Sequence, residues 1–147
     1  MEMVDALVER GSAPICVIGS SLGGFYATLA AERHGARAVV INPAVRPDLD
    51  LRAHAGPQTN LHTGARFEVT AAHFDELRAM RVGRISRPDR YFLLVRTGDE
   101  VLDYRQAVAF YAGAWQFVQG GGDHAFAGFE AQIPAILAFG GVRRPVC

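Results

Sequence analysis

A Gly-x-Ser-x-Gly sequence between a strand-like run and a helical run constrains this chain more than any other feature. The motif covers residues 19–23, after the apolar run 15–18 and before the small-residue stretch 24–31. In that setting the central serine lies on a sharp, strained turn, with its hydroxyl above the sheet and the N-terminal amides of the helix close by. The pattern therefore predicts that Ser21 is a nucleophile.

Continuous apolar runs alternate with helical patterns along the chain. Strands are expected at residues 15–18, 38–41, 91–95 and 115–118, and helices at 3–10, 22–34, 71–81, 104–112 and 126–139. Strands that are apolar throughout, instead of alternating, suit a parallel sheet covered on both faces. The length of 147 residues fits one domain. We therefore expect a single α/β domain over residues 1–147, a three-layer α/β/α sandwich with a mostly parallel sheet.

The segment 43–89 departs from this alternation. It is punctuated by proline and glycine and holds one helical pattern, over residues 71–81, with Thr70 as its N-cap. Connections of this length are uncommon in compact domains and are often active-site lids. We therefore expect a small lid or cap insertion at about 43–89.

Composition excludes several classes of function. Fifteen Lys and Arg residues balance fifteen Asp and Glu residues, so the basic surplus of a nucleic-acid-binding protein is missing. No apolar run approaches the ~20 residues of a membrane span, and residues 1–10 lack a signal-peptide pattern. The two cysteines, Cys16 and Cys147, have no metal-ligand spacing. We expect a cytoplasmic protein without nucleic-acid or membrane partners.

A serine nucleophile requires a general base, and the base requires a carboxylate to orient it. The loop after the expected strand 91–95 offers three acids. Asp99 follows Gly98 and precedes two apolar residues, which makes it the first choice; Asp103 is the second and Glu100 the third. The alternative is that Asp99 only caps the following helix.

The glycine-rich loop after the last expected strand carries the candidate base. His124 follows residues 120–122, all glycine, and precedes the last expected helix. Its neighbour Asp123 is not expected to orient it, because side chains of adjacent residues diverge. The chain order serine, acid, histidine is that of α/β-hydrolases. These signals together predict a Ser21–His124–Asp99 triad.

The other histidines fit a catalytic role less well. His34 ends a predicted helix, where a cation suits the helix dipole. Three more precede the acid and fall in the expected lid, without the i, i+4 spacing of a helical metal pair: His54, His62 and His73. No metal site is assigned.

With these segments in view, the chain resembles the YqiA-like esterase family of bacterial α/β-hydrolases. The matching segments are residues 19–27, 42–47, 97–104 and 121–126. The resemblance implies hydrolysis of small-molecule carboxylic esters, with short acyl chains favoured and no cofactor. It places Ser21, Asp99 and His124 on the triad. It also implies that the Leu22 backbone amide, directly after the nucleophile, is one oxyanion donor.

The resemblance does not extend to the N-terminal elements of the family. Family members open with a strand, a His-Gly-aromatic loop and a second strand, whereas only fourteen residues precede Ile15 here. That loop supplies the second oxyanion donor, and loss of one donor typically costs about 10²–10³ in turnover. We therefore expect an N-terminally truncated α/β-hydrolase. The rival expectation is a homodimer that covers the exposed edge of strand 15–18.

Three functions remain open at this point. The leading interpretation is a serine esterase that forms an acyl-enzyme on Ser21. An acyltransferase would use the same triad and differ only in the acceptor. A catalytically impaired hydrolase fold that acts as a binding module is the alternative from another class.

Overall fold

The computed structural model describes residues 2–9, 11, 14–60 and 63–141. Its helices and strands, with three short 3₁₀ helices (η), run in this order: α1 (Glu2–Glu9), β1 (Cys16–Ser20), α2 (Leu22–His34), β2 (Arg37–Ile41), α3 (Pro47–Asp50), η1 (Arg52–His54), β3 (Gly56–Thr59), β4 (Arg66–Val69), α4 (Ala71–Ala79), η2 (Pro88–Arg90), β5 (Tyr91–Arg96), α5 (Tyr104–Phe110), β6 (Trp115–Gln119), η3 (Phe129–Gln132) and α6 (Ile133–Phe139). Of the predicted first helix, 3–10, Arg10 lies outside the described residues.

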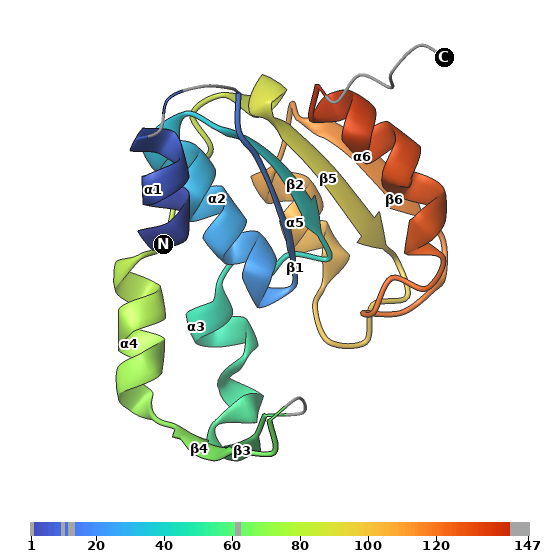
Figure 1. The fold of residues 1–147 in the computed structure, drawn as a ribbon. Coiled ribbons are helices and arrows are strands. Elements are labelled where there is room, and N and C mark those ends of the chain that lie inside the picture. Colours follow the sequence, from blue (N-terminus) through green and yellow to red (C-terminus); the bar gives the residue numbers. More distant parts are fainter. Residues whose placement is uncertain (1, 10, 12–13, 61–62, 142–147) are drawn as a thin grey trace.

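Four strands form one parallel sheet in the order β1-β2-β5-β6 (Figure 1). The register pairs Ala38 of β2 with Val17 on one side and Tyr91 on the other. All four strands occur where the sequence predicts them, and the parallel sheet is confirmed. Because the strands are parallel, their carboxyl ends meet at one edge of the sheet.

The core follows from the period-two alternation along β2. Ala38 and Val40 pack with α2 and α5 on one face, while Val39 and Ile41 pack with Phe126 and α6 on the other. Three of these β2 residues are completely buried, as expected for a sheet covered on both sides. The expected three-layer architecture is confirmed.

Residues 43–89, which we call the insertion, connect β2 to β5. The insertion extends from the end of the sheet toward which the strand arrows point (Figure 1). Its predicted helix is present as α4, with Thr70 as the N-cap residue. The sequence did not predict the antiparallel hairpin of β3 and β4.

An apolar cluster attaches α4 to α2, and an ion pair joins two parts of the insertion. Phe74 and Leu77 of α4 are buried against Phe25 of α2. Both carboxylate oxygens of Asp48 accept from Nη2 of Arg81, which follows α4. The hydrogen bond to Arg81 holds the pKa of the Asp48 carboxyl below its ordinary value. The Asp48 side chain is 3% exposed and that of Arg81 30%, so a partly buried pair links α3 to the end of α4.

The prediction of one last helix over residues 126–139 is wrong at its start. Phe126 has a φ of 59° and is buried among α6 and the sheet, and Gly128 has a φ of 83°. Positive φ values end helical continuity, so regular structure resumes only with η3 and α6. Pro134 lies in the first turn of α6, where its missing N–H costs no hydrogen bond.

Strand β1 lies at one edge of the sheet. Among the described strands it pairs only with β2. Ile18, in the middle of β1, is 54% exposed. The unpaired apolar edge expected from the sequence is therefore present in the described part of the chain.

Candidate active site

Ser21 occupies a strained turn between β1 and α2. Its φ of 54° is uncommon for a residue with a side chain. Three backbone hydrogen bonds hold the turn: the Ser21 N–H donates to Ile41 O at 2.9 Å, and the Ser21 carbonyl accepts from the N–H groups of Gly24 and Ala44 at 3.0 Å. The conformation costs about 1–3 kcal/mol and persists only where surrounding structure enforces it.

The glycines around this turn do not have equal roles. A Cβ at Gly19 would overlap the carbonyl of Gly23, so the turn requires glycine there. A Cβ at Gly24 would lie 2.7 Å from Pro43 Cβ. A Cβ at Gly23 would meet no heavy atom within 4 Å. Of the two motif glycines, only Gly19 is therefore required by a close contact, and Gly24 supplies the second close contact.

The structure brings together the three side chains predicted as a triad, although they come from three separate loops. His124 Nε2 lies 2.9 Å from Ser21 Oγ, and His124 Nδ1 lies 2.9 Å from each Asp99 carboxylate oxygen. The Asp99 side chain is 2% exposed and that of His124 20%. With Nδ1–H donating to Asp99, Nε2 is left as the acceptor for the Ser21 hydroxyl.

The alternative acids have other partners. Oδ1 of Asp99 also accepts from the N–H groups of Val101 and Leu102, both at 2.9 Å, so the turn holds this carboxylate in place. Asp103 is the N-cap of α5 and accepts from Arg105 N–H at 3.0 Å. Among the described residues, Asp99 is the only one of the three acids with a hydrogen bond to the His124 ring.

The loop that carries the acid and the loop that carries the histidine are bonded to each other. Gly98 N–H donates to Gly121 O at 3.1 Å, and Gly121 N–H donates to Thr97 Oγ1 at 2.9 Å. A Cβ at Gly98 would lie 2.5 Å from Gly122 O, so glycine is required for this approach. The site is therefore organised by backbone contacts between loops as well as by its own side chains.

Sequence reasoning missed two residues that contact the histidine loop. Glu100, considered only as an orienting acid, accepts the backbone N–H of His124 at 3.0 Å. Asn42 received no role, although its side chain donates to the same loop. No local pattern marks either contact, because the partners are 24 or more residues apart.

Leu22 is the first residue of α2. Its N–H has no acceptor inside the helix, because the first four amides of any helix lack one. The positive end of the helix dipole lies at the same point. The position thus suits the predicted oxyanion donor beside Ser21, and that role stays a prediction.

An apolar cavity of about 400 Å³ lies between α2 and the insertion. Six of its lining residues are Leu22, Tyr26, Phe67, Val69, Leu77 and Met80. Leu22 directly follows the candidate nucleophile, which places the cavity next to the Ser21 turn. Its volume falls within the usual range for small-molecule sites, about 300–1,000 Å³.

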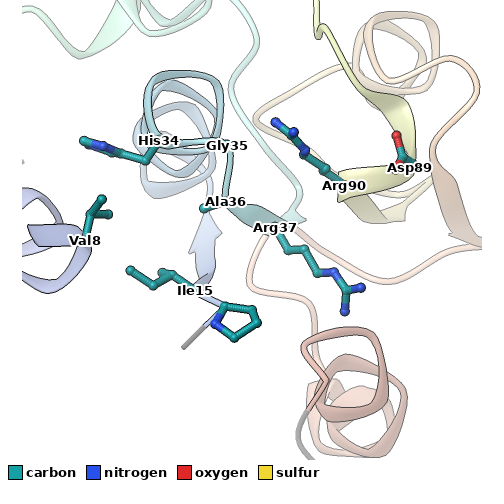
Figure 2. A pocket seen from close by; sticks show the side chains of 9 residues that line it. Val8, Ile15, His34, Gly35, Ala36, Arg37, Asp89 and Arg90 are labelled. Atoms are coloured by element: carbon teal, nitrogen blue, oxygen red, sulfur yellow. The ribbon is translucent and has the colours of Figure 1, made fainter. Parts of the chain in front are cut away.

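A second cavity, of about 380 Å³, lies at the opposite end of the sheet (Figure 2). Its residues include His34 at the end of α2, Arg37 at the start of β2, and Arg90 just before β5. Like the first cavity, it is lined by no triad residue, so its place in the fold decides. Ligands of open α/β sheets bind outside the carboxyl ends of the strands, so this cavity is not the candidate active site.

Two of the other histidines have contacts that suit a structural role. His34 Nε2 lies 2.7 Å from Asp5 Oδ1, and His73 Nδ1 accepts from Thr70 N–H at 3.0 Å. His54 ends η1, and His62, like Cys147, lies outside the described residues.

In the described part of the chain, no three His, Cys, Asp or Glu side chains are grouped to hold a metal ion. None of the described helices has the length and apolarity to cross a membrane.

Known structures place this architecture among the α/β-hydrolase folds. A candidate hydrolase of Agrobacterium vitis S4 matches with a TM-score of 0.68 and 21% identity, over 94% of this chain and 66% of that one. The esterase domain of a Rhodothermus marinus protein matches with a TM-score of 0.64 and 17% identity, over 95% and 64%. A Paleococcus ferrophilus monoacylglycerol lipase matches with a TM-score of 0.64 and 16% identity, over 97% and 74%.

At these identities the likeness establishes the fold alone. The chain spans just under two thirds of the length of the first two of these proteins. By sequence, the chain belongs to the uncharacterised protein family UPF0227, whose profile matches residues 1–141. The narrower resemblance to YqiA-like esterases stays a prediction.

Proposed function

We propose that this protein is a serine hydrolase that cleaves carboxylic esters, with Ser21 as nucleophile, His124 as general base and Asp99 as the residue that orients the histidine. One observation carries the proposal: a continuous hydrogen-bonded path, with every contact at 2.9 Å, runs from Ser21 Oγ through the imidazole to the Asp99 carboxylate. The path starts on a strained strand-to-helix turn, the position of the nucleophile in α/β-hydrolases.

The geometry supports a two-step reaction. Ser21 Oγ attacks the acyl carbon while His124 Nε2 takes its proton, and the oxyanion accepts a hydrogen bond from Leu22 N–H. The bond to the alcohol oxygen then breaks, and His124 returns the proton to the leaving alkoxide, which leaves an acyl group on Ser21. Water attacks the acyl-enzyme with His124 again as base, and the products are the free acid and regenerated Ser21. Asp99 stabilises the imidazolium in both steps.

The apolar cavity is proposed as the site for the acyl chain. It opens beside Leu22 on α2 and is bounded by Phe67, Val69 and Leu77 of the insertion. Apolar walls with few polar groups are typical of sites that bind hydrocarbon chains. On this proposal the insertion acts as a lid whose side chains set the acyl length that the enzyme accepts, with short chains preferred.

The proposal is tested by Ser21→Ala, with Ser20→Ala as the matched control. Alanine keeps the Cβ of Ser21 and removes only the hydroxyl, so the turn is preserved. Ser20 ends β1 and is exposed. We expect Ser21→Ala to lose labelling by a fluorophosphonate and to lower p-nitrophenyl acetate hydrolysis by at least about 10³-fold, while Ser20→Ala keeps both.

Melting curves for the three proteins establish that folding is matched. Labelling of wild type at a residue other than Ser21, mapped by peptide mass spectrometry, would contradict the assignment. A folded wild-type protein that neither labels nor hydrolyses would instead favour the binding-module alternative.

A further inference from the structure

Asn42 follows β2 at the carboxyl edge of the sheet. Its φ of 39° lies in the left-handed region, which asparagine tolerates better than most residues with a side chain. Asn42 is only 2% exposed. A buried carboxamide at this point is costly unless its polar atoms have partners.

Every hydrogen-bonding group of that carboxamide is used. Its Nδ2 donates to the carbonyl oxygens of Asp123 at 3.1 Å and His124 at 2.9 Å. Its Oδ1 accepts from the Arg96 N–H, at the end of β5, at 2.9 Å. The Asn42 backbone N–H donates to Leu94 O at 2.9 Å. One side chain thus joins the ends of β2 and β5 to the histidine loop.

His124 is consequently held from both sides of its own backbone. Its N–H donates to Glu100, and its carbonyl accepts from Asn42. The preceding loop has little stiffness of its own, because residues 120–122 are all glycine, the residue with the most backbone freedom. The height of the imidazole above the sheet therefore depends on contacts from outside the loop.

We propose that Asn42 is a positioning residue for the reaction: its carboxamide holds the Asp123 and His124 carbonyls so that the imidazole meets both Ser21 and Asp99. The effect on rate rests on the proposed function, whereas the effect on the loop does not. Asparagine suits the position because it combines two donors, one acceptor and tolerance of a positive φ. An aspartate of the same shape keeps the acceptor and places a carboxyl oxygen, instead of the two N–H donors, against the two carbonyls.

Two variants test the proposal, with Thr28→Val as the matched control. Asn42→Asp changes the donors with almost no change in shape. Asn42→Gly keeps the positive φ and removes the side chain, so it remains informative if the aspartate variant fails to fold. Thr28 is also buried, at 3% exposure, and its hydroxyl bonds Gly24 O and Tyr111 OH on the face of α2 that packs on α5. Its replacement removes buried hydrogen bonds without touching the histidine loop.

We expect kcat for p-nitrophenyl acetate to fall by about 10²-fold in the Asn42 variants, with KM within about twofold, because a base displaced by about 1 Å loses reactivity and not substrate binding. The rate of fluorophosphonate labelling should fall in parallel. Backbone hydrogen exchange over residues 119–126 should accelerate in both Asn42 variants. Thr28→Val should leave kcat within about twofold and exchange in that loop unchanged.

Three results would overturn the proposal: an unchanged kcat in both folded Asn42 variants, an equal loss in Thr28→Val, or unchanged exchange over residues 119–126. Failure of the proposed function is recognised separately, since wild type would then neither hydrolyse nor label. In that case the exchange comparison alone decides whether Asn42 holds the loop.

Discussion

The carboxyl edge of the sheet and the insertion are built in different ways. At the edge, the two central strands behind the site, β2 and β5, are mostly buried, and the loops in front of it are joined by hydrogen bonds through Asn42, Glu100 and Gly98. In the insertion, α4 packs on α2 through a small apolar cluster, and a partly buried ion pair joins Asp48 to Arg81. Phe67 is half exposed and Leu49 is 45% exposed.

This difference separates chemistry from specificity. Catalytic groups must be held within fractions of an ångström, which requires a rigid support. A wall of a substrate cavity tolerates looser attachment, because hydrophobic contact is non-directional. We therefore expect changes at the edge to affect kcat most, and changes in the insertion to affect stability and acyl-chain preference.

After Ser21→Ala, the largest effect is expected from Asp99→Asn. An amide can donate to Nδ1 and so hold the wrong histidine tautomer, an exchange that lowers kcat by about 10⁴ in a serine protease. We expect a loss of at least about 10² here. Asp103→Asn is the matched control: asparagine is also a good N-cap, so kcat should stay within about twofold. A larger loss in the Asp103 variant would contradict the choice of acid.

A smaller effect, on stability, is expected from Asp48→Asn. The change removes the charge partner of Arg81 inside the insertion, and we expect a loss of about 1–3 kcal/mol in the free energy of unfolding. The lower part of this range is favoured because Arg81 is 30% exposed. Asp75→Asn, which breaks the exposed pair with Arg78, should cost at most about 0.5 kcal/mol. Urea titrations measure both.

The same pair gives a pH dependence with a definite sign. The folded-state pKa of Asp48 lies below its unfolded value because Arg81 donates to the carboxylate. Its contribution is therefore present above about pH 4 and is lost as pH falls through the folded-state pKa. The stability gap between wild type and Asp48→Asn should shrink below about pH 4. A stability difference that grows on acidification would contradict this pH dependence. Loss of fluorophosphonate labelling in the folded Asp48→Asn variant at neutral pH would contradict a purely structural role of the pair.

The smallest effect is expected from Phe67→Ala. Phe67 lines the cavity and is 52% exposed, so its loss should affect the wall more than stability. We expect kcat/KM for p-nitrophenyl octanoate to fall about two- to fivefold relative to acetate, because each buried methylene contributes roughly 0.8 kcal/mol at most. Trp115→Ala, at the exposed start of β6, should leave the ratio unchanged. An equal loss for both esters would argue against an acyl-chain site here.

The sequence was sufficient for the parts of this protein that local patterns encode. The Ser21 turn is specified by its neighbours, since an apolar run, Gly19 and a small-residue helix lie within a few residues of it. The candidate catalytic residues could be identified because each lies in the segment directly after a predicted strand. The carboxyl ends of parallel strands meet at one edge of the sheet, so Ser21, Asp99 and His124 could be expected to lie close together.

Only the tertiary structure decided the features that depend on distant partners. The last helix starts later than predicted because Phe126 packs into the core against β2 and β5. Helical propensity does not reflect such a long-range contact. The β3–β4 hairpin has short, exposed strands, one of them with Pro57, and so carries a weak signal. Asn42 reaches its loop partners across 81 and 82 residues. A hydrogen bond between groups so far apart in the chain leaves no trace in local periodicity, since it exists only once the sheet has brought the loops together.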